Sequence, residues 1–169
     1  MTKFKNREEA EVVMVHYTLS AANAFATELA VKLDPNAPPK KQKFPFRFIF
    51  MSAWGAEQDQ FRSLWMWADS RKIKGAAEKG LFDIADNSTL IEGKRCFEVI
   101  ALRAGGVVAK GDSISTLFSE AVAPYIGVDR LARCAIRQAL EGTGSAEKRI
   151  LENAQCLGDD WGMINTQSF

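Results

Sequence analysis

Two short apolar segments separated by an amphipathic segment constrain the fold of this chain more than any other feature. Phe46–Met51 and Cys96–Leu102 are runs of aromatic and aliphatic residues, typical of strands that are buried on both faces. Between Leu64 and Ala85, apolar residues recur at the spacing of one helical face, at Ile73, Ala77, Leu81 and Ile84. A strand, a helix and a strand in this order predict two parallel strands joined by a crossover helix.

Two further segments carry helical stripes. One predicts a helix from about Arg7 to Leu33, and the other predicts a helix over Val128–Leu140 that ends just before Gly142. Glu147–Leu151 is compatible with a short strand. Together these elements predict an α/β fold: a partial Rossmann-like three-layer unit with a small parallel sheet flanked by helices. We expect one truncated domain over residues 1–169, with an exposed proline- and lysine-rich loop at 34–45 and a patternless tail at 158–169.

Composition excludes several classes of function. Lys plus Arg number 22 and Asp plus Glu number 21, so the net charge of +1 provides no field that would attract nucleic acid or an anionic membrane. The three cysteines are widely spaced, which argues against a metal site and against a secreted disulfide scaffold. An apolar leader and an apolar run of membrane-spanning length are both missing, so we expect a cytoplasmic protein.

Several strings resemble the C-terminal part of the atypical or extended short-chain dehydrogenases/reductases, in order and in spacing. They extend over about Val12 to Asn153 and include Phe48–Ser52, Arg71–Glu78, Phe97–Gly106 and Val128–Ala132. The resemblance implies that Ser52 corresponds to the catalytic serine at a strand end and Lys74 to the lysine of the Tyr-x-x-x-Lys motif. It also implies that Arg103, Gly105 and Gly106 form the turn beside the nicotinamide, if NAD(P) is bound.

Departures from the family pattern argue against redox chemistry. No segment supplies the glycine-rich turn that binds the pyrophosphate of a dinucleotide. Ser70 stands at the position of the tyrosine, and an aliphatic hydroxyl has too high a pKa to replace a phenol as the proton donor. Ala104 replaces the proline of the family's Arg-Pro-Gly turn. We therefore expect no bound cofactor. The candidate catalytic residues are Ser52, Lys74 and Ser70.

An aromatic cluster lies where the family places its substrate loop, at Trp54, Phe61, Trp65 and Trp67. These side chains fit an apolar ligand pocket, and a core or interface role fits them equally well. Likewise, a serine after a strand, a lysine on a helix and glycines after a strand have ordinary structural uses.

Three functions follow from the resemblance. The first is a short-chain dehydrogenase-like protein without dinucleotide binding, which binds an apolar small molecule and acts as an isomerase, dehydratase or cyclase. The second is an NAD(P)-dependent oxidoreductase whose nucleotide-binding half is supplied elsewhere. The third is a non-catalytic docking module. If the family's first three or four strands are missing, the strand Phe46–Met51 loses its inner neighbour and should expose an edge. This predicts a homodimer, or a complex with a related chain, with that strand or the first helix at the interface.

Overall fold

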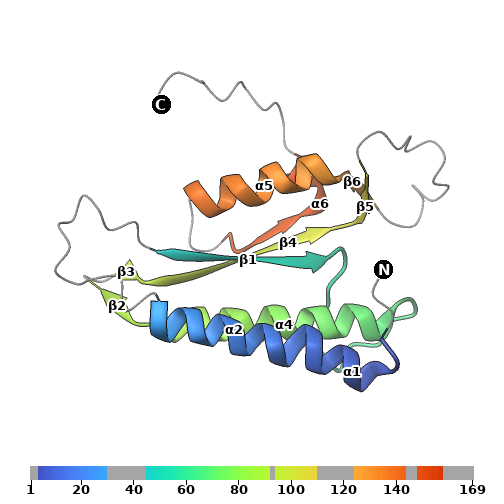
Figure 1. Cartoon of the computed structure of the whole chain (residues 1–169). Coiled ribbons are helices and arrows are strands. Elements are labelled where there is room, and N and C mark those ends of the chain that lie inside the picture. Colours follow the sequence, from blue (N-terminus) through green and yellow to red (C-terminus); the bar gives the residue numbers. More distant parts are fainter. Residues whose placement is uncertain (1–3, 30–44, 92–93, 110–123, 144–147, 158–169) are drawn as a thin grey trace.

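The computed structural model describes residues 4–29, 45–91, 94–109, 124–143 and 148–157. The predicted loop at 34–45 lies almost wholly outside these ranges, and the predicted tail at 158–169 lies wholly outside them. The described residues form three layers, with one sheet between two layers of helices (Figure 1). This arrangement confirms the predicted α/β fold with a small parallel sheet packed against helices.

The sheet has the strand order β1-β4-β7, and both pairings are parallel. Its strands are β1 (Phe46–Ala53), β4 (Phe97–Ala104) and β7 (Ile150–Glu152). The central strand β4 is almost wholly buried, as the predicted two-sided apolar pattern requires. Strand β1 has β4 on one side and no strand on its other side among the described residues, so it is an edge strand.

One layer of helices consists of an N-terminal rod and α4 (Figure 1). The rod joins helical and wider π-helical segments: α1 (Arg7–Glu11), η1 (Val12–Tyr17), α2 (Thr18–Ala24) and η2 (Phe25–Leu29). The stripe of the helix predicted from about Arg7 to Leu33 is confirmed in its described part, because Val15, Ala22 and Ala26 are buried against the core. Residues 30–33 lie outside the described ranges. Phe25 stacks on Phe46 with ring centroids 5.4 Å apart, which fixes the rod against β1.

Helix α4 spans Ala68–Asp86 and therefore begins four residues later than predicted. Trp67, directly before it, has φ 52° and ψ 33°, the left-handed conformation that a helix cannot contain. The buried face of α4 contains the predicted residues Ile73, Ala77 and Leu81. The periodic pattern therefore located the helix correctly. The first residue of the helix depends on the backbone conformation of Trp67, which apolar periodicity cannot predict.

The other layer consists of α5 (Val128–Glu141) and the short α6 (Asn153–Leu157). The buried face of α5 packs on a second apolar cluster that contains Ile100 and Leu102 of β4. Arg47 of β1 donates from Nη1 to the carbonyl oxygens of Ala139 and Leu140, at 3.3 and 3.0 Å. This contact places the C-terminal end of α5 over the beginning of β1.

Two short pairings were not predicted. Strands β2 (Leu90–Ile91) and β3 (Lys94–Arg95) are antiparallel, and β5 (Gly106–Val108) is parallel to β6 (Tyr125–Gly127). Each is only two or three residues long, too short to produce a period in the sequence.

Gly75 permits the loop before α4 to lie against that helix. A Cβ atom at this position would be 1.8 Å from the carbonyl oxygen of Glu57, a backbone atom. At Gly80, one helical face away, the nearest atom is the flexible side chain of Leu19 at 2.7 Å. We expect Gly75→Ala to lower the free energy of unfolding by about 1–3 kcal/mol, because the loop must move.

The matched control is Gly80→Ala in the same helix. Each substitution gains about 1 kcal/mol of helix propensity, so this gain cancels when the two variants are compared. Urea denaturation of both variants checks the prediction. Equal effects of the two substitutions would show that the loop does not depend on Gly75.

Candidate functional site

The three parallel strands end in a level row of polar side chains. Ser52 of β1 lies directly opposite Arg103 of β4, and Arg103 lies opposite Glu152 of β7. Side chains that are level on neighbouring strands point to the same face, and here that face carries α4. Ligands of open α/β sheets bind near these carboxyl ends of the strands, so the row is the natural place to seek a site.

Glu78 of α4 is the centre of this row. Its side chain is fully buried and accepts four hydrogen bonds. Ser52 Oγ donates to Oε1 at 2.5 Å, and Gln58 Nε2 donates to Oε2 at 2.9 Å. Arg103 forms a bidentate ion pair with the same carboxylate, donating from Nε to Oε1 at 2.9 Å and from Nη2 to Oε2 at 2.6 Å. Arg103 also donates from Nη1 to Glu152 at 3.0 Å. We call these five residues the Glu78 network.

Charge pairing keeps Glu78 ionised. Burial alone raises the pKa of its carboxyl group, but the hydrogen bonds from Arg103, Gln58 and Ser52 and the positive charge of Arg103 together lower that pKa below its ordinary value. A carboxylate with a lowered pKa is a weak base. Ser52 therefore donates to a group that is unsuited to removing its proton, and the geometry does not activate the hydroxyl as a nucleophile.

Lys74 lies beside the network, at the outer edge of β1. Its Nζ donates to the carbonyl oxygen of Met51 at 2.9 Å and lies 5.0 Å from the centre of the Phe50 ring. That carbonyl points away from β4, because the even-numbered residues of β1 make the bonds to β4, as at Phe46. Burial lowers the pKa of Lys74, and the charge of Glu78 partly offsets this effect. The ammonium group of Lys74 is thus a hydrogen-bond donor to the outward-facing carbonyl of Met51.

The other residues of the expected catalytic and cofactor sets lie apart or have partners of their own. Ser70 is exposed in the first turn of α4, outside the Glu78 network. The amide of Gly105 donates to Asn153 Oδ1 at 2.8 Å, and a Cβ there would be 1.7 Å from the carbonyl oxygen of Pro124. A Cβ at Gly106 would be 2.4 Å from the ring of Tyr125. Pro124 and Tyr125 of the same chain therefore occupy the space beside these two glycines.

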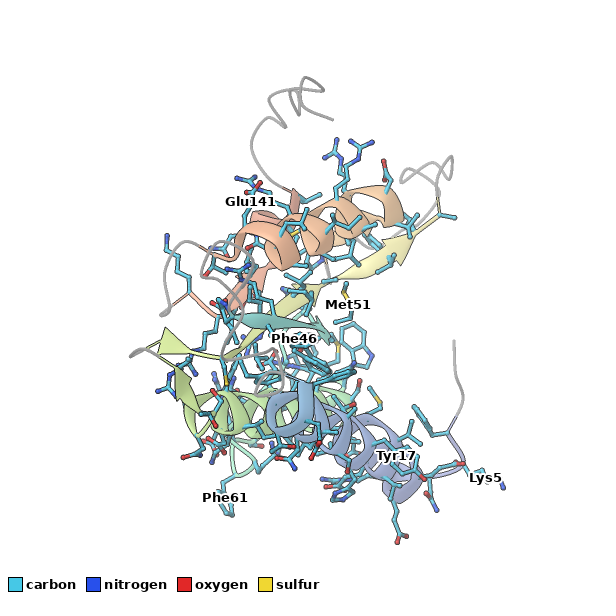
Figure 2. All side chains as sticks on the ribbon, turned by 60° about the vertical axis from the view of Figure 1, so that its left-hand side comes forward. Lys5, Tyr17, Phe46, Met51, Phe61 and Glu141 are labelled. Carbon is cyan, nitrogen blue, oxygen red and sulfur yellow. The ribbon has the colours of Figure 1, made fainter. Side chains whose placement is uncertain are left out.

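The four aromatic residues of the expected pocket are exposed to solvent. Phe61 and Trp65 are 98% and 89% exposed, and Trp54 and Trp67 are 38% and 54% exposed. Figure 2 shows Phe61 pointing away from the sheet below α4, whereas Met51 lies between β1 and α5. Phe61 lines an open hollow on α4 with Ala76, Lys79 and Phe82 among others. These positions do not enclose an apolar ligand.

A polar hollow of about 440 Å³ beside the network is lined by three arginines, Arg62, Arg71 and Arg103. Arg103 is paired as described, Arg62 is paired with Glu57 at 2.9 Å, and Arg71 donates from Nε to the carbonyl oxygen of Gly55 at 2.6 Å. Acidic partners therefore balance two of the three positive charges. Among the described residues, no group of three or more His, Cys, Asp or Glu side chains could hold a metal ion. The described helices are too short or too polar to cross a bilayer.

Of the five residues of the Glu78 network, the sequence analysis singled out Ser52 and Arg103 as candidate site residues and did not single out Glu78, Gln58 or Glu152. Glu78 did leave a signal, because it is a carboxylate on the otherwise apolar face that includes Ala77, Leu81 and Ala85. A charged residue in such a position needs a buried partner. The identity of that partner follows only from the strand register.

Comparison with known proteins adds no assignment, since no family model, no curated protein and no solved structure matches this chain.

We expect Glu78→Gln to lower the free energy of unfolding by about 2–4 kcal/mol, because the substitution leaves the half-buried charge of Arg103 without its main partner. Glu152→Gln is the matched control. It removes the exposed partner of the same arginine and should cost less than about 1 kcal/mol. Chemical denaturation at neutral pH measures both changes, and a loss from Glu152→Gln as large as that from Glu78→Gln would contradict the central place of Glu78.

Proposed function

We propose that this chain is a non-catalytic docking module, related to the short-chain dehydrogenases/reductases, whose docking surface is the open edge of β1. The observation that carries the proposal is a contrast. The side chains of Ser52 and Lys74, two of the three expected catalytic residues, are engaged by internal partners, while β1 has no strand on its outer side among the described residues.

Strand β1 has the composition of an interior strand. Six of its eight residues are apolar, whereas natural edge strands are usually protected by charges, proline or a bulge. The backbone groups of its odd-numbered residues point outward, from Arg47 to Ala53, and Lys74 occupies one of the outward carbonyl oxygens. The remaining groups are suited to pairing with another strand.

Helix α5 adds an exposed apolar stripe near this edge. Val128, Ala132, Ile136 and Leu140 recur every four residues, and Ile136 and Leu140 are 61% and 73% exposed. Met51, 42% exposed, lies on the same side of the sheet, because Ile49 two residues earlier packs in the cluster under α5 (Figure 2). An apolar helix face beside an apolar strand edge favours a protein partner over water.

The partner that fits this surface is a second copy of the chain. A twofold axis perpendicular to the sheet would pair β1 with its copy in antiparallel orientation and extend the sheet to six strands. The same axis would bring the two α5 helices together on one face, because α5 lies over β1, the edge strand.

Cofactor-independent catalysis by Ser52 and Lys74 has less support. Ser52 donates to an ionised carboxylate, Lys74 donates to a backbone carbonyl, and the four aromatic residues are exposed to solvent. An NAD(P)-dependent activity would also need the dinucleotide-binding turn that no segment supplies.

We expect the purified chain to be a dimer in light scattering, and Met51→Lys and Ile136→Lys each to produce a monomer by placing a charge at the joined edge. Val107→Lys is the control, since Val107 is 52% exposed on β5, away from the edge. A monomeric wild-type chain, or a Met51→Lys variant that remains dimeric, would refute docking through this edge.

Calorimetric titration separates docking from oxidoreduction. The proposal predicts no heat of binding when NADPH or NADH is titrated into the folded dimer. Saturable binding in the micromolar range would instead favour the oxidoreductase alternative. The dinucleotide site would then lack the usual glycine-rich turn.

A further inference from the structure

Arg71 differs from the other half-buried arginines of the described chain. Arg47, Arg103 and Arg149 are half-buried as well, and each has a carboxylate oxygen close to a guanidinium nitrogen, at 2.9, 2.6 and 2.5 Å. Arg71 has no carboxylate partner among the described residues. A charge that is partly removed from water is costly unless an opposite charge compensates it. Arg71 is therefore the described arginine that is best suited to hold an anion.

The side chain of Arg71 is held in a fixed position. Its Nε donates to the carbonyl oxygen of Gly55 at 2.6 Å. Gly55, two residues after β1, has φ 69°, a conformation that favours glycine, and a Cβ atom there would be 3.1 Å from Arg71 Nε. The carbonyl oxygen of Arg71 in turn accepts from the amide of Glu57 at 3.0 Å. A side chain that is already in position loses little conformational entropy when it binds a ligand.

The bond to Gly55 leaves one side of the guanidinium group for a ligand. Nε is engaged, whereas Nη1 and Nη2 have no hydrogen-bond partner among the described residues. These two nitrogens lie side by side in the guanidinium plane and match the two oxygens of a carboxylate. Arg71 also lines the polar hollow of about 440 Å³, near the carboxyl ends of β1 and β4, so a ligand can reach it.

The charges around the hollow limit the ligand to a single negative charge. The other two arginines of the hollow are already paired with carboxylates: Arg62 with Glu57, and Arg103 with Glu78 and Glu152. One positive charge, that of Arg71, is left without an opposite charge. A second negative charge on the ligand would be repelled by the carboxylates of these pairs.

We propose that Arg71 binds the carboxylate of a small monocarboxylic acid in this hollow. Nη1 and Nη2 donate to the two carboxylate oxygens, and the apolar part of the acid lies toward Ala56 and Ile150, which also line the hollow. The volume is within the range of small-molecule sites, about 300–1,000 Å³. The carboxylate site is separate from the proposed docking surface, because no residue of β1 or α5 lines the hollow.

The first test follows the Nε–H resonance of Arg71 by ¹H–¹⁵N NMR of the full chain. Sodium acetate is added at constant ionic strength, and the resonance is assigned by its loss in Arg71→Gln. We expect a saturable shift with acetate and no shift with acetamide, which has the shape of acetate without its charge. Inorganic phosphate, mainly a dianion at about pH 8, should bind more weakly than acetate. A shift that does not saturate, an equal shift with acetamide, or tighter binding of phosphate would each overturn the proposal.

Thermal unfolding provides a second readout with a matched control. Acetate at about five times its dissociation constant should raise the unfolding midpoint by about 2–4 °C relative to chloride at the same ionic strength. Arg71→Gln should lose this rise, and Arg130→Gln should keep it. Arg130 is exposed on α5 and has no carboxylate partner among the described residues, so both substitutions remove one unpaired positive charge. An equal rise in the two variants would show a general effect of acetate and would contradict a site at Arg71.

Arg71→Lys separates the paired donors from the charge. Lysine keeps the positive charge but lacks two parallel N–H donors, so the affinity for acetate should fall by about tenfold. An unchanged affinity would refute bidentate binding. The wild-type titration decides the main question even if a variant fails to fold. Light scattering in the same buffers reports the oligomeric state separately, so a monomer that binds acetate would refute docking through β1 and leave the carboxylate site supported.

Discussion

The ion pair between Glu78 and Arg103 is the interaction on which the rest of the structure depends. It joins α4 to the central strand, reaches β1 through Ser52 and the preceding loop through Gln58, and continues to β7 through Glu152. A buried ion pair adds little net stability compared with apolar packing, but an unpaired buried charge is costly. The network therefore acts mainly on specificity, because only the observed register brings Ser52, Arg103 and Glu152 level above Glu78.

This constraint changes the meaning of the residues that resemble catalytic ones. The polar atoms of Ser52 and Arg103 are engaged by Glu78. Lys74 binds the outward carbonyl of Met51, where it protects part of an exposed strand edge. These side chains thus stabilise the fold, and the surface that is left without a described partner is the β1 edge with the α5 stripe.

Apolar periodicity was enough to predict the layers but not the contacts between them. Phe46–Met51, Cys96–Leu102 and the stripe of α4 are local patterns, and they gave the parallel sheet and the helix that crosses it. The start of α4 was missed because the left-handed conformation of Trp67 has no signature in the pattern. The Glu78 network was missed because Ser52 and Glu78 are 26 residues apart, and a pairing at that separation follows from register alone. The expected aromatic pocket rested on sequence proximity, which does not determine where side chains such as Phe61 point.

The ionisation of Glu78 is the measurement that tests this account most directly. Carbon-13 NMR of the glutamate carboxyl groups, assigned with Glu78→Gln, follows that single side chain as the pH is lowered. The account predicts a carboxylate that stays ionised below the ordinary pKa of glutamate, about 4.3, for as long as the chain is folded. Titration of Glu78 near neutral pH in the folded chain would mark it as a proton donor of the kind that enzymes use, and would contradict the assignment of the network to structure.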